Sequence, residues 1–404
     1  MKKRVLFVDD EASVLQGLQR LLFELEEKWE MRFLLSAEEA LEHLRSHPCE
    51  VLVTDMKMPG MSGAQLLTEV RRMHPGVVRI VLTGQTDRGT LLKAVSATHM
   101  FLSKPCDAEM LERTVERACS LQSMLRSESL RQLAGGMESL PSPPTLYHEF
   151  VSVMQRPDVS VNEISSIIVR DMGITAKLLQ FVNSAFFGLP RRITNPAQAI
   201  SLLGMETVKG LILGTQVFSS FDESLIQGAR LDSLWDHSFR VAIIARNLAR
   251  AEKLPPMGQD DCFTGALLHD VGKLVLASSV PDDFAKAIKA MEDRGCSASE
   301  AELEVFGASH AEVGAYLIDL WGIPGAVVEA IGFHHRPGDA GATEFTALTA
   351  VHAANAFDIQ LHSAGGVGGG SLLDEQYLKS VGLDGRVSEW RRLALAALDE
   401  EAVA

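Results

Sequence analysis

The sequence has few cysteines and no pair with the C-x-x-C spacing of a zinc ribbon. Its five cysteines are an odd number spread over 404 residues, which does not fit a disulfide framework. We therefore expect reduced thiols and a cytoplasmic protein. No stretch approaches the ~18 uninterrupted apolar residues of a membrane-spanning helix. The start, MKKRVLFVDDE, has only a four-residue apolar stretch, so we expect no signal peptide and no membrane association.

An excess of basic residues is also missing, and the charge is unevenly distributed. The net charge is −15. Residues 1–120 carry 16 Lys/Arg and 18 Asp/Glu, a net of −2, whereas the other 284 residues carry 22 and 35, a net of −13. A surface this acidic repels phosphate backbones. A DNA-binding output therefore ranks last among the functions considered for residues 121–404.

The first 120 residues alternate short apolar runs with amphipathic segments. Strands are predicted at residues 4–8, 31–35, 51–54, 78–82 and 100–103, with helical patterns between them. Alternation of this kind is typical of a parallel sheet covered by helices on both faces. We predict an α/β, doubly wound domain with a five-stranded parallel sheet over residues 1–120.

The remainder shows no period-two alternation and is predicted to be all-helical. A helical pattern that starts at Asp107 continues to Ala134 and stops at Gly135-Gly136. We assign residues 121–136 to a connecting helix, 137–345 to a helical-bundle domain, and 346–404 to helices that continue it or pack on it. The glycine-rich stretch at 363–371 is predicted to be a loop, since it lacks the Gly-Lys-Ser/Thr of a phosphate-binding loop.

Five polar residues follow the predicted strands of the first domain. In an open parallel sheet, functional groups gather beyond the carboxyl ends of the strands. Converging carboxylates require a hard divalent cation such as Mg²⁺, and a nearby lysine supplies positive charge for a phosphate. The set predicts phosphoryl transfer to Asp55. The residues at the strand ends are Asp9 and Asp10, Asp55, Thr83, and Lys104.

The motifs VLFVDDE, VTDMKMPGMSG, VLTGQ and FLSKP make this region resemble the receiver domain of two-component response regulators. The resemblance implies that Asp9 and Asp10, with Asp55, hold Mg²⁺ and that a sensor histidine kinase phosphorylates Asp55 in a bacterial phosphorelay. It also implies that Lys104 pairs with the phosphoryl group and that Thr83 moves toward it. Phe101 occupies the position of the aromatic switch residue of this family.

Seven of the twelve histidines lie between His237 and the C-terminus. An adjacent His-Asp pair in an apolar helix is costly to bury unless metal or other partners satisfy it. Together, histidine and carboxylate suit Zn²⁺, Fe²⁺ or Mn²⁺. The long spacing requires ligands from separate helices that converge in a bundle. The residues considered for a divalent transition metal are His237, His269, Asp270, His310, His334 and His335.

This histidine set resembles the HD superfamily of metal-dependent phosphohydrolases. Asn355 stands where that superfamily places its last aspartate ligand, and losing this carboxylate weakens a divalent site. His352 and Asp358 lie one turn to either side and are the residues considered as replacements. The sequence HHRPGDAGATEF lacks the Gly-Tyr-Pro signature of the HD-GYP subgroup, so cyclic di-GMP hydrolysis is not expected.

The segments upstream of the histidines, including DMGITAKLLQFVNSAFFGLPRRI and AISLLGMETVKGLIL, resemble the HDOD domain, as do LLHDVGKLVL and AEVGAYLIDLWGIP. The resemblance covers residues 137–340 and implies an HD-related signalling module that acts through protein contacts.

We therefore predict a response regulator in which Asp55 phosphorylation controls an HDOD output that binds a downstream signalling protein. The alternative is a phosphorylation-regulated, metal-dependent phosphohydrolase. The apolar stripe of the helix from Asp107 to Ala134 prompts a further hypothesis, a homodimer; the competing interpretation is that the stripe packs on the HDOD domain.

Overall fold

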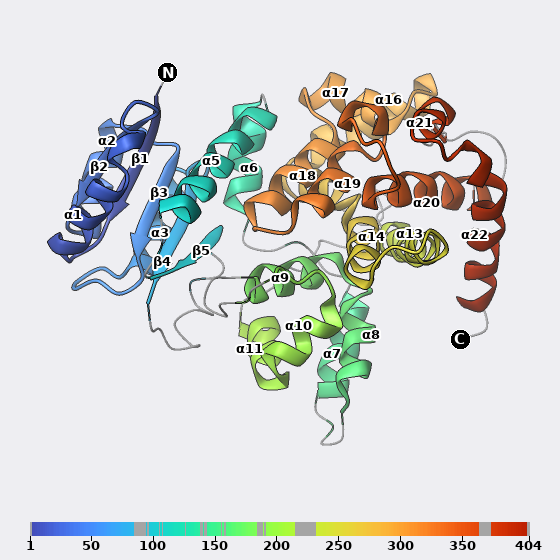
Figure 1. Cartoon of the computed structure of the whole chain (residues 1–404), viewed down its shortest axis with the longest axis horizontal. Helices are drawn as coiled ribbons and strands as arrows, with labels where there is room; N and C mark the ends of the chain where they lie inside the picture. The colour runs from blue at the N-terminus through green and yellow to red at the C-terminus, as the bar shows by residue number, and fades with distance from the viewer. Residues whose placement is uncertain are drawn as a thin grey trace.

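The computed structural model describes residues 2–401 except 85–93, 95–96, 105, 107, 126, 138–139, 141–143, 155, 157–158, 184–188, 190, 215–231 and 363–372. The predicted loop at 363–371, the predicted helix start at Asp107 and residues 184–188 of the motif DMGITAKLLQFVNSAFFGLPRRI lie outside the described residues. Two regions are visible in Figure 1: an α/β domain at the N-terminal end and a helical region that contains the rest of the chain.

The α/β domain contains one parallel sheet in the order β2-β1-β3-β4-β5. The central strands β3 and β4 are buried along their whole length, because helices cover both faces of the sheet. All five predicted strands are present, with ends that differ by at most two residues from the prediction. The strands are β1 (Lys3–Val8), β2 (Trp29–Leu34), β3 (Val51–Asp55), β4 (Val78–Thr83) and β5 (Met100–Ser103).

Amphipathic helices and one short 3-10 helix connect these strands. Ser36 caps one helix through its hydroxyl, which accepts a hydrogen bond from the backbone N–H of Glu39. Ser62 and Gln65 form a full capping box on another. The connecting helices are α1 (Ala12–Leu21), η1 (Phe23–Leu25), α2 (Ala37–Ser46) and α3 (Gly63–Met73).

The connector is two helices rather than the single helix that the sequence predicted. The first, α5, spans Ala108–Met124, and the second, α6, spans Glu128–Gly136, where Ser127 caps its start. Leu125 lies at the break and is fully buried. The prediction of an uninterrupted helix was wrong because Ser127 can cap a new helix start, and tertiary packing of Leu125 stabilises the bend.

Much of the apolar stripe of this connector, among the residues whose side chains the structure describes, is covered within the chain. Both α5 and α6 pack against α18 (His310–Leu320), and α6 also contacts α3. Leu130 and Ala134 are buried. Figure 1 shows the two connector helices between the sheet and the helical region. Among the described residues, this packing on α18 agrees with the competing interpretation, and the homodimer stays a prediction.

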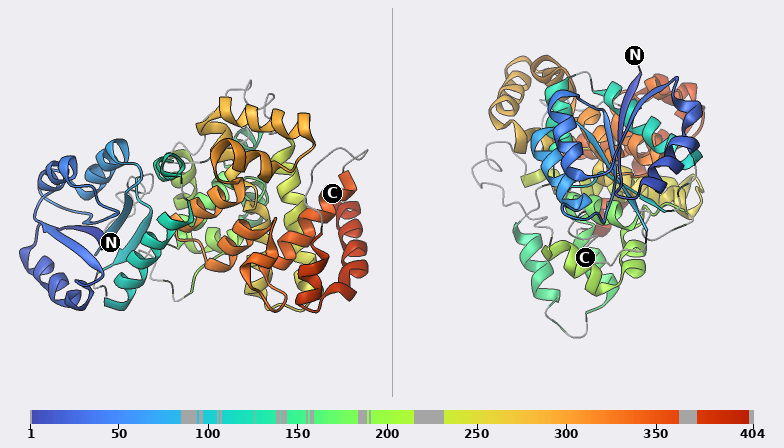
Figure 2. Two further views of the ribbon diagram at one scale, coloured as in Figure 1. Left: turned by 90° about the horizontal axis from the view of Figure 1, so that it is seen from above. Right: turned by 90° about the vertical axis from the view of Figure 1, so that its left-hand side faces the viewer.

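The helical region has a smaller lobe and a larger bundle, as seen in Figures 1 and 2. The lobe is formed by α7 (Pro144–Met154), α8 (Val161–Ile168), α9 (Met172–Val182), α10 (Pro196–Leu203) and α11 (Met205–Gly214). The bundle is formed by α13 (Asp232–Ala251), α14 (Pro256–Leu268), α15 (Val271–Ser279), α16 (Pro281–Arg294), α17 (Ala298–Phe306), α18, α19 (Gly325–Phe333), η3 (Pro337–Ala340) and α20 (Ala347–His362).

The C-terminal helices pack on this bundle rather than forming a separate unit. They are α21 (Glu375–Ser380), η4 (Asp384–Arg386) and α22 (Val387–Glu401). Trp390 is fully buried, and its indole N–H donates to Glu252 Oε1 at 2.8 Å. Arg386 Nε donates to the same oxygen. The half-buried carboxylate of Glu252, just after the end of α13, therefore anchors the C-terminal helices.

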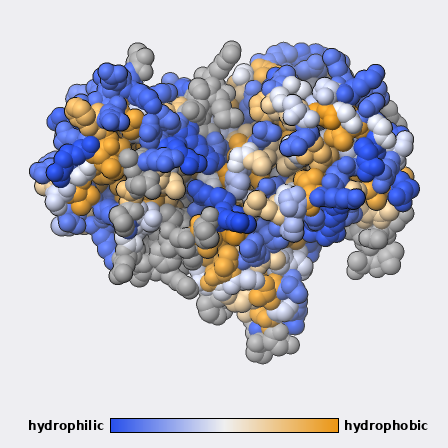
Figure 3. All heavy atoms as spheres, viewed as in Figure 1, coloured by the Kyte–Doolittle hydropathy of each residue, from blue (hydrophilic) through white to orange (hydrophobic). Residues whose placement is uncertain are grey.

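Hydrophilic side chains cover most of the face shown in Figure 3, and apolar ones form separate patches over the α/β domain, the lobe of α8–α11 and the bundle. All five cysteines are free. Among the described residues, no helix has both the length and the apolar character needed to cross a bilayer.

Arg79 holds the end of the connector against the sheet. Its side chain is 1% exposed, and its guanidinium donates to the carbonyl of Gly135 at 2.6 Å and to that of Ala97 at 2.7 Å. A Cβ at Gly135 would lie 2.5 Å from the carbonyl oxygen of Pro75, so only glycine allows this approach. Burial lowers the pKa of Arg79 to about 9, which still leaves the side chain charged at neutral pH.

His99 completes this contact and predicts a pH dependence. Its Nδ1 accepts from the backbone N–H of Arg79, and its Nε2 lies 2.7 Å from Nη2 of Arg79 and 3.0 Å from the carbonyl oxygen of Gly135. Burial and the nearby Arg79 charge lower the pKa of His99 well below 6.5. The pKa of His99 is ~6.5 in the unfolded chain and lower in the folded chain. Between these two values the unfolded state binds one proton more than the folded state. The stability contributed by neutral His99 is therefore present above pH ~6.5 and is lost as the pH falls.

We therefore expect the α/β domain to become less stable between about pH 6.5 and pH 4.5. The measurement is urea unfolding at several pH values, monitored in the parent and in His99→Gln. The variant is less stable at pH 7.5, and its curve falls less steeply on acidification. A slope unchanged by the substitution would contradict the assignment.

Candidate functional sites

The first site lies at the carboxyl ends of β1, β3 and β5. Lys104 follows β5, and its ammonium donates to Asp9 Oδ2 at 2.6 Å and also to Asp55 Oδ1. Asp9 is 2% exposed and Asp55 is 9% exposed. The strand order puts β1 beside β3, which is the switch point at which an open α/β sheet places its functional groups. The structure thus brings together three of the residues predicted from the sequence.

The lysine is held in its charged form. Burial alone lowers the pKa of Lys104, but its hydrogen bonds to Asp55 and Asp9 outweigh that effect and raise the pKa. The backbone N–H of Lys57 donates to Asp55 Oδ2 at 2.6 Å, and that of Glu11 donates to Asp9 Oδ1 at 3.0 Å. Both carboxylates are therefore fixed by donors on one side while each presents an oxygen to the lysine.

The turn after Asp55 depends on two glycines. Gly60 has φ +75°, which favours glycine. A Cβ at Gly63 would lie 1.8 Å from the carbonyl oxygen of Asp55. Any other residue at this position would therefore displace the end of β3. The start of α3 packs directly against the strand that carries Asp55.

The other predicted residues of this site lie next to Asp9 in the chain or on the neighbouring strands β4 and β5. Asp10 is exposed, Thr83 is the last residue of β4 and is buried, and Phe101 is 6% exposed within β5. The all-oxygen donor set of Asp9, Asp10 and Asp55 fits a hard divalent cation such as Mg²⁺. Asp9 and Asp55 already converge on one cation, the ammonium of Lys104.

The second site is a cluster of histidines around Asp270, where the ends of several bundle helices meet. His269 and Asp270 form the junction between α14 and α15, and both are fully or nearly fully buried. His310 begins α18, and the pair His334 and His335 follows α19. His237 reaches the cluster from α13. All six predicted residues are therefore brought together.

A close contact between two helix starts places Asp270 beside His310. A Cβ at Gly272 would lie 1.9 Å from the carbonyl oxygen of His310 and 2.8 Å from the amide nitrogen of Gly314. Only glycine allows the backbones of α15 and α18 to approach this closely. The result is a distance of 3.2 Å between Asp270 Oδ1 and His310 Nε2.

Four of these histidines have their Nδ1 atoms fixed by a hydrogen-bond partner. The partners are Ala266 O for His269 at 2.6 Å, Ile331 O for His334 at 2.7 Å, Glu302 Oε2 for His310 at 2.6 Å, and Asp358 Oδ2 for His237 at 2.7 Å. This assigns the second nitrogen, Nε2, to the cluster. In metal-binding histidines, the ring nitrogen that does not bind the metal is typically hydrogen-bonded to a carbonyl or carboxylate, which orients the ring.

Several buried polar atoms in the cluster lack a well-aligned hydrogen bond. Within the part of the chain that the structure describes, these are His269 Nε2, His334 Nε2 and Asp270 Oδ1, although Asp270 Oδ1 lies within ion-pair distance of His310 Nε2. An unsatisfied buried polar atom costs about 1–3 kcal/mol. Acceptor nitrogens and a carboxylate oxygen that share one enclosed space are satisfied together by a cation.

The charge states agree with this interpretation. Burial lowers the pKa of His269 to about 4 and, with the neighbouring histidines, that of His334 well below 6.5. Both rings are therefore neutral at pH 7, as a metal ligand must be. Burial also lowers the pKa of His310, but Glu302 and Asp270 outweigh it and raise the pKa to about 8. Without a bound cation, the proton on His310 balances Asp270.

Two overlapping sets of ligand atoms lie within 4.8 Å of one another: Asp270 with His310, His334 and His335, and Asp270 with His237 and His269. The shared carboxylate can bridge two ions. Imidazole with one carboxylate suits Zn²⁺, Fe²⁺ or Mn²⁺. The donor set and the orphaned atoms therefore fit a divalent transition metal.

Asn355 and its neighbours do not restore the carboxylate that the sequence lacks. Asn355 is buried, and its Oδ1 has no partner among the described residues. Asp358 forms a two-bond ion pair with Arg240 and holds His237. Both nitrogens of His352 are used, by the carbonyl of His334 and the backbone N–H of Asp374. Neither residue replaces the missing ligand; Asp358 instead orients His237.

Sequence reasoning missed two residues that shape this cluster, Glu302 and Arg240. Glu302 is 3% exposed on α17 and accepts from both the backbone N–H and the Nδ1 of His310. One feature of the sequence could have indicated Glu302. This glutamate lies next to Ala301 on the apolar face of a helix that ends just before His310. Arg240 lies three residues after His237, one helical turn away. Its partner, Asp358, is far along the chain.

Comparison with protein families gives two matches. The model described as the response regulator receiver domain matches residues 5–116, and that of the HDOD domain matches residues 140–337. An uncharacterized protein of Treponema pallidum is 28% identical over 207 residues, which are 50% of this chain and 39% of that protein. The hydrogenase transcriptional regulatory protein HoxA of Cupriavidus necator is 34% identical over 122 residues, 30% of this chain and 25% of HoxA.

The chain thus spans about two fifths or less of the length of these curated relatives. Among solved structures, the MmoQ response regulator of Methylococcus capsulatus aligns over 63% of this chain and 98% of its own, with 21% identity and a TM-score of 0.49. The signal receiver domain of an HD domain-containing protein from Pseudomonas fluorescens aligns over 31% of this chain and 100% of its own, with 30% identity and a TM-score of 0.30.

Proposed function

Because the chain carries an N-terminal receiver domain at residues 5–116 and an HDOD domain at residues 140–337, we propose that it is the phosphorylation-controlled regulator of a two-component phosphorelay. A receiver domain implies a histidine kinase as its partner. Asp55 accepts the phosphoryl group, with Mg²⁺ held by Asp9, Asp10 and Asp55. The HDOD domain then transmits the signal by binding a downstream protein.

The single observation that carries this proposal is direct contact between the two domains. Arg117 of α5 forms an ion pair with Asp319 of α18 and donates to the carbonyl of Ile323 at 2.8 Å. Gln180 of α9 donates to the carbonyl of Thr98 at 3.0 Å, just before β5. β5 contains Phe101 and ends just before Lys104. The contact with Gln180 therefore links the opposite end of β5, its start, to the helical domain.

The chemistry at Asp55 follows from the positions of its neighbours. Asp55 supplies the oxygen that attacks phosphorus while the bond from phosphorus to the imidazole nitrogen of the kinase histidine breaks and that imidazole leaves. The phosphoryl oxygens develop charge beside the Lys104 ammonium. The Lys104 ammonium then pairs with the phosphoryl group in place of a carboxylate. This weakens its hydrogen bonds to Asp9 and Asp55. A change at Lys104 acts on β5, and β5 is connected to α5 and through Arg117 to the HDOD domain.

A second candidate function is metal-dependent phosphate-ester hydrolysis. The observation that favours it is the set of unpartnered His269, His334 and Asp270 atoms. The residues that would hold the metal are Asp270 and the histidines of the two ligand sets, and a bound metal would supply a hydroxide near neutral pH. The replacement of the last carboxylate by Asn355 favours the binding module over the enzyme.

The test of the main proposal is hydrogen exchange on the full chain with and without a phosphoryl mimic such as beryllofluoride. We expect exchange in residues 310–323 to change several-fold in the parent when the mimic binds. In Arg117→Ala, the ion pair is lost at a cost of about 1 kcal/mol or less because it is partly exposed. Exchange in this segment should then be higher from the start and respond less to the mimic.

The matched control is Arg113→Ala on the same helix, because Arg113 pairs only loosely with Glu109 and both side chains are well exposed. Arg113→Ala should behave as the parent does. Equal responses in the parent and in Arg117→Ala would show that this contact does not transmit the signal.

A further inference from the structure

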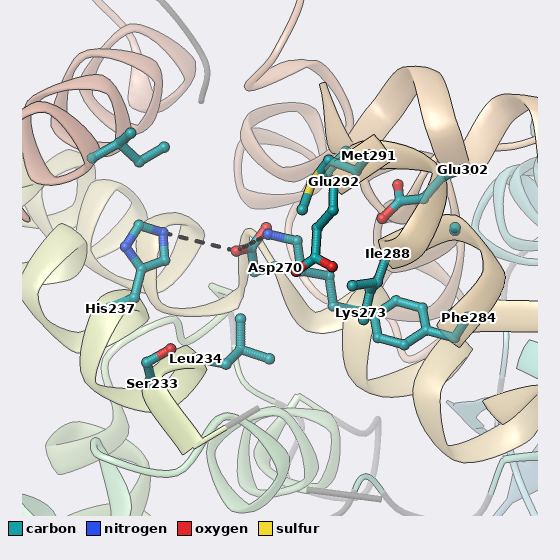
Figure 4. A pocket seen from close by; sticks show the side chains of 13 residues that line it. Ser233, Leu234, His237, Asp270, Lys273, Phe284, Ile288, Met291, Glu292 and Glu302 are labelled. Carbon is teal, nitrogen blue, oxygen red and sulfur yellow. Dashed lines mark hydrogen bonds and ion pairs between the residues drawn. The ribbon is translucent and has the colours of Figure 1, made fainter. Parts of the chain in front are cut away.

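A cavity of about 310 Å³ opens beside the histidine cluster, between α13, α15, α16, α17 and α20. Figure 4 shows that side chains from opposite walls point into it. A closed core would fill such a space, because unfilled apolar volume lowers stability. The volume lies at the lower end of the ~300–1,000 Å³ typical of binding pockets. It has room for one large side chain of a partner rather than for a whole helix.

The longest wall of the cavity is apolar and is one face of α16. Phe284, Ala287, Ile288 and Met291 recur at helical spacing along this face and line the cavity. Ile288 and Met291 are only partly buried. Leu234 faces them from α13. The wall therefore offers apolar contact to a side chain that enters from outside.

The charged groups of the lining exclude an anionic ligand. Lys273 is the one lysine or arginine among the described lining residues, and its Nζ already donates to Asp270 Oδ2 at 2.7 Å. An anion would also face the carboxylates of Glu292 and Glu302. Glu302 is engaged inside the domain, where its Oε2 accepts from Nδ1 of His310 at 2.6 Å. The lining thus favours a neutral group inside and a cation at the opening.

The opening of the cavity is acidic. Glu292 is exposed, and its side chain extends from α16 into the cavity (Figure 4). Residues 281–306, which include α16 and α17, carry seven Asp/Glu and three Lys/Arg, a net of −4. Two of these bases pair with acids of the same segment, Lys286 with Asp283 and Arg294 with Glu304.

This negative charge selects between two kinds of partner. It attracts a basic protein surface and raises the rate of association with it. It repels a second copy of this chain, because residues 121–404 carry a net charge of −13 and the receiver domain is slightly acidic as well. Charge complementarity therefore favours a basic segment of another protein.

We infer that the cavity is the docking site for a partner protein that inserts one aromatic side chain against α16 and places flanking lysines or arginines at Glu292. An aromatic anchor in a desolvated pocket with a polar rim supplies much of the binding energy of many protein interfaces. The inference rests on the proposed function, since it names the surface through which the HDOD domain binds its downstream protein.

The test is fluorescence anisotropy of the full chain with three rhodamine-labelled peptides. The first, AKAAKWAAKAAKA, carries one tryptophan among lysines. The second, AKAAKAAAKAAKA, lacks the tryptophan, and the third, AEAAEWAAEAAEA, has glutamate in place of every lysine. We expect the first peptide to bind at least about tenfold more tightly than either of the others, because only it supplies both the anchor and the complementary charge.

Variants of the apolar wall locate the bound tryptophan. Ala287→Phe fills the cavity and should weaken binding of the first peptide at least about tenfold while leaving the second unchanged. Ala285→Phe is the matched control, because Ala285 lies on the same helix but is exposed. Ala298→Phe fills the cavity from α17 and serves if Ala287→Phe does not fold. Thermal unfolding verifies each variant.

A charge reversal locates the lysines. Glu292→Lys should weaken the first peptide several-fold more than Asp293→Lys does. Both substitutions change the net charge of α16 equally, and Asp293 is exposed but does not line the cavity. Equal effects of the two would mean that the peptide responds only to the overall charge of the domain.

Equal affinities for the first two peptides, binding unaffected by both filling variants, or equal effects of the two charge reversals would overturn the inference. The exchange response of residues 310–323 to beryllofluoride is measured on the same protein. A normal response without peptide binding counts against the cavity alone. Peptide binding without that response supports the docking site and counts against the proposed control by phosphorylation.

Discussion

Asp55→Asn is expected to abolish phosphorylation of the chain by a small phosphodonor in the presence of Mg²⁺, a loss of at least about 100-fold in labelling rate. The amide keeps the shape of the carboxylate and can still accept the backbone N–H of Lys57. It lacks the anionic oxygen that attacks phosphorus and contributes one less charge to the cation. The measurement is incorporation of radiolabelled phosphate with an acyl phosphate donor.

The other carboxylates of the chain make this experiment specific. Asp358→Asn in the helical domain also removes a buried carboxylate. It should label at the parental rate, because the polar partners of this carboxylate among the described residues, His237, Arg240 and His362, all belong to the helical domain. Labelling of Asp55→Asn at the parental rate would mean that another residue accepts the phosphoryl group. Lys104→Ala should still be labelled but fail to change exchange in residues 310–323.

The α/β domain was largely predictable because its signals are local. Each strand is a short apolar run that ends at a polar residue, so the positions of Asp9, Asp55 and Lys104 followed from strand ends and parallel topology. The turn glycines also have a local cause: Gly63 lies against the carbonyl oxygen of Asp55. The break at Leu125 was not predicted, since the stripe continues through it and the bend depends on packing against α18.

The helical site was predictable as a list of residues but not as an arrangement. Histidines at 237, 269, 310 and 334 could be grouped by their contexts, and they meet around Asp270. The tertiary contacts that orient them, such as Glu302 to His310, join side chains on different helices and leave no periodic trace. Asp358 illustrates the limit: its position suggested a ligand, whereas its pairing with Arg240 makes it a residue that orients His237.

The second large effect is expected at the metal-holding cluster. Purified parent protein should bind Mn²⁺ or Zn²⁺, and a metal present at 100 times its Kd raises the free energy of unfolding by about 2.7 kcal/mol. Asp270→Ala should lose both bound metal and this stabilisation, because Asp270 belongs to both ligand sets. His269→Ala should lower metal content less, since it belongs to one. Elemental analysis and chelator-dependent melting measure the two effects.

His352→Gln is the control that separates a ligand from a merely buried histidine. His352 is as buried as His269, but both of its nitrogens already have partners. The substitution should lower stability and leave the metal content unchanged. A parental metal content in Asp270→Ala would refute the site. Metal-dependent turnover of phosphate esters that disappears in His269→Ala would favour hydrolysis over binding, whereas metal without turnover supports a cation that fixes the packing of α14, α15, α18 and α19.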